Sequence, residues 1–378
     1  MPGKKTLSAL DILVVGGGVG GISTAIALKR SGATVELIDI KTDWGMIGAG
    51  LTLTGPTLRA FRDLGVLDAI AERAYVGNGI RVCDTQGKVL HELDTPMKGS
   101  EDVPGSGGIQ RPVLHEILEQ RLRAEGVPVT LGLSVTALDQ VDGGVDVTFT
   151  DGRRKRYDLV IGSDGVGSLV RRMIIPDSPA PAYTGQNSWR VSVPRPAHVD
   201  RRHYFLGGPH KVGFTPVSKD EMYLFLLEVG PKIFREESGL HVPMAELLAS
   251  YGGPVAEIRD AMNADSKIVF RPLEGFFLPA PWYRGRVLLV GDSAHPTTPQ
   301  LASGAGMAVE DALVLEDELL KTDDIDAALV SYMTRREARC RLIVESSMTI
   351  GRLEQARAPI SEQTAVVERA LNKLQEPI

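Results

Sequence analysis

Residues 12–22, ILVVGGGVGGI, decide the fold. The apolar run ILVV is typical of a parallel strand that is buried on both faces. The glycines that follow fit the pattern GxGxxG and open a segment with helical spacing of apolar residues. Gly16 permits the tight turn, Gly18 lets the backbone approach a pyrophosphate, and Gly21 lets helix and strand pack closely. The stretch therefore predicts a strand, a turn and a helix whose N-terminus binds phosphate.

Outward from this stretch, strand character resumes over residues 35–38, and Asp39 closes that strand 18 residues after Gly21. An acid at this place accepts hydrogen bonds from the ribose hydroxyls of a dinucleotide. The pattern does not separate FAD from NAD. A glycine-rich turn that binds no ligand is the alternative interpretation.

The composition limits the classes of protein that this chain can belong to. With 378 residues, 43% apolar and 24% charged, we expect a folded chain of two domains. A net charge of −6 argues against a nucleic-acid partner. Cys83 and Cys340 form no disulfide framework or zinc pattern, and we expect no metal site. Without a signal peptide or a run of about 20 apolar residues, we expect a cytoplasmic protein with no membrane partner.

The order of patterns along the chain predicts an α/β fold with a discontinuous first domain. Helical spacing occurs at about 57–73, 307–320 and 326–354, and short alternating runs between two Pro-rich segments indicate a β-rich insert. We expect a dinucleotide-binding domain of residues 1–75, 105–180 and 276–330. A β-rich substrate domain would take residues 76–104 and 181–275, and residues 331–378 would form a C-terminal helical segment.

Two further motifs follow buried strands. Residues 158–171 read DLVIGSDGVGSLVR and place Asp164 and Gly165 in a turn, which alone is a common structural feature. Residues 286–312 carry GDSAHP and then a helix that begins near Gly304. There Asp292 would accept hydrogen bonds from ribityl hydroxyls, and Gly304 and Gly306 would let backbone lie against a flavin ring. As the alternative, Asp292 caps a turn and His295 is a surface residue.

These three motifs in this order resemble the single-component flavoprotein monooxygenases, the family of para-hydroxybenzoate and salicylate hydroxylases. The resemblance extends from about Ile12 to Ser347. It implies a Rossmann-like FAD-binding domain with an inserted, mostly β substrate domain and C-terminal helices. It also implies non-covalent FAD as cofactor and NADH or NADPH as co-substrate.

Several residues of this chain match the family's cofactor motifs. Gly16, Gly18 and Gly21 would hold the FAD pyrophosphate, and Asp39 the adenosine ribose, where family members usually have Glu. Asp292 would hold the ribityl chain. The other matching positions are Arg111 at the ribityl-phosphate region, Asp164 and Gly165 in the motif shared by FAD and NAD(P)H, and Pro299 beside the flavin. The chain departs from relatives at Gly55-Pro56 and at Thr52, where some relatives carry histidine, so this loop predicts no base.

The resemblance implies that a reduced flavin adds O2 as a C4a-hydroperoxide, which hydroxylates a small aromatic substrate. A hydroxybenzoate or a hydroxylated N-heteroaromatic is expected. Arg190 would pair with a substrate carboxylate or phenolate. His210 or Tyr223 would take or relay a proton. Trp189, Tyr204, Phe214 and Pro216 belong to the same candidate group. As alternatives, Trp189 and Phe214 are more often core residues, Arg190 forms a surface ion pair, and His210 is a solvated turn residue.

Other activities stay open at this point. Related flavoenzymes epoxidise, N-hydroxylate or reduce isoprenoid chains, and a non-catalytic FAD-binding redox protein is a further alternative. Within the C-terminal helix, we interpret Tyr332, Arg335, Arg339 and Ser346 as structural anchors to the FAD domain. The sequence is compatible with a monomer or a homodimer.

Overall fold

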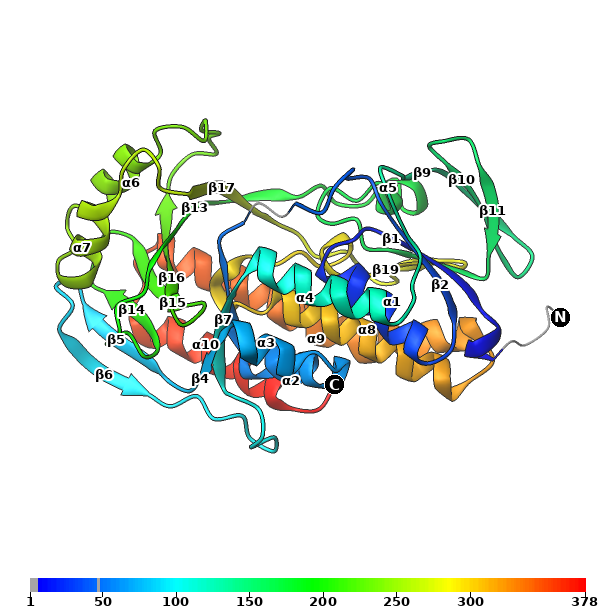
Figure 1. Ribbon diagram of the computed structural model, residues 1–378, viewed down its shortest axis with the longest axis horizontal. Coiled ribbons are helices and arrows are strands. Elements are labelled where there is room, and N and C mark those ends of the chain that lie inside the picture. The colour runs from blue at the N-terminus through cyan, green and yellow to red at the C-terminus, as the bar shows by residue number, and fades with distance from the viewer. Residues whose placement is uncertain (1–5, 46–47) are drawn as a thin grey trace.

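The computed structural model describes residues 6–45 and 48–378. Figure 1 shows an elongated molecule with a strand-rich region at each end and long helices between them. At one end lies a six-stranded sheet in the order β18-β19-β12-β1-β2-β8, in which only β18 is antiparallel to its neighbour. Its strands are β1 (Asp11–Val15), β2 (Thr34–Asp39), β8 (Val129–Leu131), β12 (Leu159–Gly162), β18 (Tyr283–Arg284) and β19 (Val287–Leu289). The predicted mixed α/β class and its parallel strand–turn–helix unit are confirmed.

Helices pack beside this sheet in successive pairs. α1 (Val19–Arg30) contacts α4 (Arg111–Ala124) and α8 (Gly304–Lys321), α8 contacts α9 (Ile325–Gln355), and α9 contacts α10 (Ile360–Gln375). The boundary expected after residue 330 falls inside α9, which is one continuous helix. The remaining short helices are α5 (Leu169–Ile174), η1 (Leu7–Ala9), η2 (Gly291–Ser293) and η3 (Pro299–Leu301).

The helical stretch expected over 57–73 is two helices, α2 (Gly55–Leu64) and α3 (Leu67–Arg73). Gly65 separates them with φ of +82°, a left-handed conformation that ends α2. A single apolar pattern runs through both helices, and glycine stops the first of them because it adopts this conformation without a side-chain clash.

At the other end of the molecule lies a seven-stranded sheet in the order β17-β13-β16-β15-β14-β5-β6. All neighbours are antiparallel except β14 and β5. Buried side chains of α6 (His241–Leu247) and α7 (Gly253–Ala261) pack with Trp189 and Phe214 into a separate apolar cluster. Trp189 and Phe214 are therefore core residues, which was the alternative interpretation for both. The strands are β5 (Ile80–Asp84), β6 (Val89–Leu93), β13 (Ala182–Pro194), β14 (Arg202–Leu206), β15 (Lys211–Pro216), β16 (Glu221–Val229) and β17 (Ile268–Gly275).

Two three-stranded sheets complete the fold. One has the order β3-β7-β4, and the other has the order β11-β10-β9. The first packs directly against the seven-stranded sheet through glycines, because a Cβ on Gly50 would lie 2.1 Å from the Tyr223 ring and one on Gly108 would lie 2.6 Å from the Thr215 methyl. The strands are β3 (Gly50–Thr54), β4 (Tyr75–Gly77), β7 (Ser106–Gln110), β9 (Val135–Val141), β10 (Gly144–Phe149) and β11 (Arg154–Tyr157). Within the described ranges, no helix has the length and apolar character that crossing a membrane requires.

Candidate active site

A cavity of about 510 Å³ lies between the six-stranded sheet with its helices and the seven-stranded sheet. This size is within the range of small-molecule and cofactor pockets. Its wall includes residues from every motif that the sequence singled out, although those motifs lie far apart along the chain. The predicted residues on this wall are Gly18, Arg111, Gly165, Arg190, Tyr204, Tyr223, Asp292, Pro299 and Gly304.

The three glycines of the first motif have different surroundings. Gly16 has φ of +112°, and a Cβ there would lie 2.3 Å from the carbonyl oxygen of Ser163. A Cβ on Gly21 would lie 1.8 Å from the Gly16 carbonyl oxygen, so this position packs turn against helix. A Cβ on Gly18 would meet nothing within 4 Å, and Gly18 lines the cavity at the N-terminus of α1. Only Gly18 of the three therefore offers open backbone to a ligand.

Asp39 holds the glycine turn from the end of β2. Its carboxylate accepts hydrogen bonds from the backbone N–H of Gly17 at 2.6 Å and of Lys41 at 2.8 Å. The other side of Gly17 contacts His115, whose Nε2 lies 2.8 Å from the Gly17 carbonyl oxygen. The sequence analysis missed His115, although it lies one helical turn after Arg111 and therefore on the same face of α4.

Asp164 is occupied by protein groups. Its carboxylate accepts hydrogen bonds from the Ser168 hydroxyl, from the N–H groups of Leu169 and Val170, and from the Ser293 hydroxyl at 3.2 Å. Ser293 also accepts a hydrogen bond from the N–H of Gly165. The Asp164 side chain thus ties the second motif to the third, and Gly165 is the member that lines the cavity.

Asp292 and the start of α8 form another part of the cavity wall. Asp292 is exposed to the cavity, and the surrounding protein raises the pKa of its carboxyl, against the opposing effects of His295 and Arg111. Gly304 begins α8 at the cavity. Gly306 does not face it: a Cβ there would lie 2.3 Å from the Thr57 hydroxyl, so this glycine packs α8 against α2.

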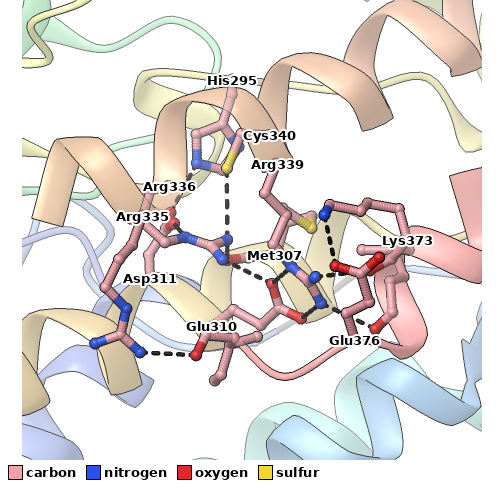
Figure 2. Close-up of polar contacts among 12 residues, drawn as sticks. His295, Met307, Glu310, Asp311, Arg335, Arg336, Arg339, Cys340, Lys373 and Glu376 are labelled. Carbon is pink, nitrogen blue, oxygen red and sulfur yellow. Dashed lines mark hydrogen bonds and ion pairs between the residues drawn. The ribbon is translucent and has the colours of Figure 1, made fainter.

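Five ionisable side chains form a buried ion cluster, shown in Figure 2, that includes His295 of the GDSAHP turn. His295 Nε2 lies 2.7 Å from Asp311 Oδ2, which also accepts the Gly291 N–H at 2.8 Å. Arg336 donates to Asp311 and Glu310, and Arg339 donates to both oxygens of Glu310 at 2.8 Å. The ion cluster consists of His295, Glu310, Asp311, Arg336 and Arg339.

The ionisation of this cluster follows from its neighbours. Burial favours the neutral form of Asp311, but His295 and Arg336 outweigh it and hold the pKa of Asp311 at about 2. Burial likewise opposes the charge of His295, but Cys340 and Asp311 raise the pKa of His295 well above its ordinary value. His295, Asp311 and Cys340 place three atoms that could bind a metal ion within 4.8 Å of one another. Arg336 already donates hydrogen bonds to two of these residues, Asp311 and Cys340.

The two arginines on the cavity wall lack the carboxylate partners that the arginines of the ion cluster have. The side chains of Arg111 and Arg190 make no hydrogen bond or ion pair with any residue in the described ranges. Burial lowers the pKa of Arg190, and the charge of Arg111 lowers it further, whereas Tyr223 opposes this effect. Guanidinium groups carry only hydrogen-bond donors, so this wall is suited to an anion or to a carbonyl oxygen.

Tyr223 lies beside Arg190 on the same face of the sheet. It pairs with Ser192 across the β13–β16 ladder, and Arg190 is two residues from Ser192, a diagonal neighbour. Tyr223 is buried, and its hydroxyl lies 2.6 Å from the hydroxyl of Thr52, which lies 3.0 Å from that of Thr215. The sequence analysis weighed Thr52 without giving it a role and missed Thr215.

His210 lies elsewhere. Lys211 lines the cavity, but His210 lines a separate depression together with Glu228 and Arg235, on the side of the sheet that α6 and α7 cover. Its Nδ1 is buried without a hydrogen-bond partner within the described ranges, and burial lowers its pKa. Alternation along β15 places neighbouring residues on opposite faces, and the sequence does not tell which face borders the cavity. The structure does not bring His210 together with Arg190 and Tyr223.

Comparison with known proteins follows this geometry. The family model described as FAD binding domain matches residues 9–347. A 2-heptyl-3-hydroxy-4(1H)-quinolone synthase of Pseudomonas aeruginosa strain UCBPP-PA14 is 32% identical over 359 residues, covering 93% of this chain and 91% of the relative. A 3-amino-4-hydroxybenzoate 2-monooxygenase of Streptomyces cremeus is 32% identical over 316 residues, covering 81% and 77%.

The fold has a solved counterpart with its cofactor. The crystal structure of Klebsiella pneumoniae HpxO complexed with FAD and uric acid matches with a TM-score of 0.82 and 25% identity, covering 97% of this chain and 93% of that one. The family resemblance predicted from the three motifs is confirmed. This chain belongs to the FAD-binding domain family, and it is an FAD-dependent monooxygenase.

Proposed function

We propose that this enzyme uses NADH or NADPH and O2 to hydroxylate a small aromatic or N-heteroaromatic compound that carries an oxygen substituent. One observation supports this most: a single cavity joins the open glycine turn at Gly18 to two arginines, Arg111 and Arg190, that have no partner in the described ranges. The names of the relatives point in the same direction, because they include a quinolone synthase and a hydroxybenzoate monooxygenase.

The residues present fit FAD. The backbone at Gly18 and the first turn of α1 would bind the pyrophosphate, since the space where a Cβ would stand is open. Arg111 would neutralise phosphate charge, and Asp292 would accept hydrogen bonds from the ribityl chain. Asp39, which is not among the lining residues, would bind the adenosine ribose while it holds the Gly17 N–H. When bound, FAD supplies the redox chemistry that activates O2 for transfer of one oxygen atom.

The substrate would lie against the seven-stranded sheet. Arg190 would bind an anionic or carbonyl oxygen of the ring system and orient it. Tyr223 would hydrogen-bond the same group and lies on the same face of the sheet. Pro299 and the start of α8 would cover the ring and exclude water from the reacting atoms.

The ion cluster would position Asp292. Asp311 holds the Gly291 N–H, and His295 follows Asp292 by three residues, so the GDSAHP turn is fixed from behind.

The test begins with the visible spectrum of purified protein and reconstitution of the apoprotein with FAD, monitored by quenching of flavin fluorescence. Arg111→Met should weaken FAD binding about tenfold, because it removes one charged contact of roughly 1.4 kcal/mol. Arg123→Met is the matched control, since Arg123 lies on the same helix and 64% of its side chain is exposed.

NADH and NADPH oxidation is then measured with hydroxybenzoates and hydroxypyridines, and products are analysed with labelled oxygen. One compound should accelerate oxidation and gain one labelled oxygen atom. A protein that cannot bind FAD, or one that binds FAD without stimulation by any such compound, contradicts the proposal.

A further inference from the structure

We infer that Thr215, a buried residue outside the cavity wall, fixes the Tyr223 hydroxyl through Thr52 as a hydrogen-bond donor into the cavity. Together with Arg190 it thereby selects a substrate that presents an oxygen acceptor. This inference rests on the proposed function and deepens it by naming the chemical group that the site recognises. Its basis is the geometry of three hydroxyl groups.

The three hydroxyls form a chain with one buried end. Thr215 is 1% exposed, and its hydroxyl has a single partner within the described ranges, the Thr52 hydroxyl at 3.0 Å. Thr52 has two partners, Thr215 and Tyr223, the latter at 2.6 Å. Tyr223 and Thr52 line the cavity, whereas Thr215 is not among the lining residues.

The direction of this chain is set first at its buried end. Each hydroxyl carries one hydrogen and can accept at its oxygen. The hydrogen of Thr215 has only the Thr52 oxygen to receive it, and leaving a buried donor unpaired is costly. The Thr52 oxygen could also accept from Tyr223, but we assign the Thr52 hydrogen to the Tyr223 oxygen at 2.6 Å, which leaves the hydrogen of Tyr223 for the cavity.

Arg190, which lies beside this hydrogen on the cavity wall, offers no hydrogen-bond acceptor. The Arg190 guanidinium has donors only and is a diagonal neighbour of Tyr223 on the sheet. Two donor groups on one face bind a phenolate, carboxylate or carbonyl oxygen well and reject an amino group, whose hydrogens would face theirs. The Tyr223 ring is held in place by Gly50, where any side chain would meet it.

The experiment compares two probe pairs that differ in one group: 4-hydroxybenzoate with 4-aminobenzoate, and 3-hydroxypyridine with 3-aminopyridine. Dissociation constants are measured with FAD-loaded protein by the change in flavin absorbance on titration. The wild-type protein should prefer the hydroxy member of a pair at least about tenfold. An equal or stronger affinity for the amino member would overturn the inference, since Tyr223 would then accept.

Thr215→Val tests the positioning role, because it removes the fixed end of the chain without touching the cavity wall. Thr52 can then accept from Tyr223, and the hydroxy-to-amino preference should fall about threefold to fivefold. Thr215→Ser, which keeps the hydroxyl, should restore the preference. If Thr215 had a purely structural role, Thr215→Val would weaken the binding of both members of a pair equally.

Thr54→Val is the matched control. Thr54 is a buried threonine on the same strand as Thr52, but its hydroxyl pairs with Thr57 at 3.0 Å instead. The hydroxy-to-amino preference of Thr54→Val should equal that of the wild type. An unchanged preference in Thr215→Val, with both proteins loaded with FAD, would overturn this inference and leave the proposed function standing. FAD-loaded wild-type protein that binds neither pair contradicts the proposed function itself.

Discussion

The arginines of the ion cluster and those of the cavity wall are the same residue type in opposite circumstances. Arg336 and Arg339 are buried, and carboxylates accept from both. Arg190 and Arg111 have no such partner within the described ranges. Arg190 is half-buried and Arg111 is exposed, and a partly buried cation without a partner adds nothing to folding stability. The contrast separates arginines that build the fold from arginines kept available for a ligand.

The location of each set supports this distinction. The ion cluster joins the GDSAHP turn to α8 and α9, and Arg339 also donates to the carbonyl oxygens of Lys373 and Leu374 at 2.9 Å near the end of α10. Arg190, by contrast, lies on β13 of the seven-stranded sheet and lines the cavity. Substituting each set should therefore change different measurable properties.

The largest effect is expected for Arg336→Met. It leaves Asp311 and Glu310 buried with fewer partners, and breaking a buried ion network in this way costs about 3–5 kcal/mol of unfolding free energy. Urea denaturation monitored by circular dichroism measures the change. Arg123→Met, at an exposed pair with Glu119, should cost less than about 1 kcal/mol. Equal costs for both substitutions would break the comparison.

Arg190→Met should have the opposite profile. Removing a cation that lacks a partner leaves the unfolding free energy unchanged or slightly raised. The same change should lower kcat/KM for the best substrate about 100-fold, since it removes a charged contact to the reacting ring. Substrate-stimulated NAD(P)H oxidation and urea denaturation on one preparation measure both. A strong loss of stability would assign Arg190 to the fold instead.

The sequence predicted what depends on local pattern. GxGxxG after an apolar run specified the strand, the turn and the helix, and Arg111, Asp292 and Pro299 lie on the cavity wall as their motifs suggested. The short-range spacing within each motif carries this information. The structural role expected for Arg339 likewise agrees with its place in the ion cluster.

What the sequence did not predict depends on pairing between distant segments. Thr52 and Thr215 are 163 residues apart, and only the contact of β3 with β15 and β16 brings their hydroxyls together. His210 was grouped with Tyr223 because both lie on the inserted sheet. Which face of a strand borders a cavity is decided by packing that one strand does not encode.

The smallest effect concerns pH and again separates the two sets. The pKa of Asp311 is about 2 in the folded protein and about 3.8 when unperturbed, so its stabilising effect is complete above 3.8 and is lost as the pH falls through 2. This difference corresponds to about 2 kcal/mol. The gap in unfolding free energy between the wild type and Asp311→Asn should therefore shrink by about 2 kcal/mol between pH 5 and pH 2.

Arg190→Met provides the contrast for that measurement. Arg190 has no carboxylate partner in the described ranges whose protonation would release it, so the pH profile of Arg190→Met should run parallel to that of the wild type. Urea denaturation at several values of pH gives both comparisons. Parallel profiles for Asp311→Asn and the wild type would show that His295 and Arg336 do not hold Asp311 ionised. Asp311 would then contribute hydrogen bonds to the ion cluster but no negative charge.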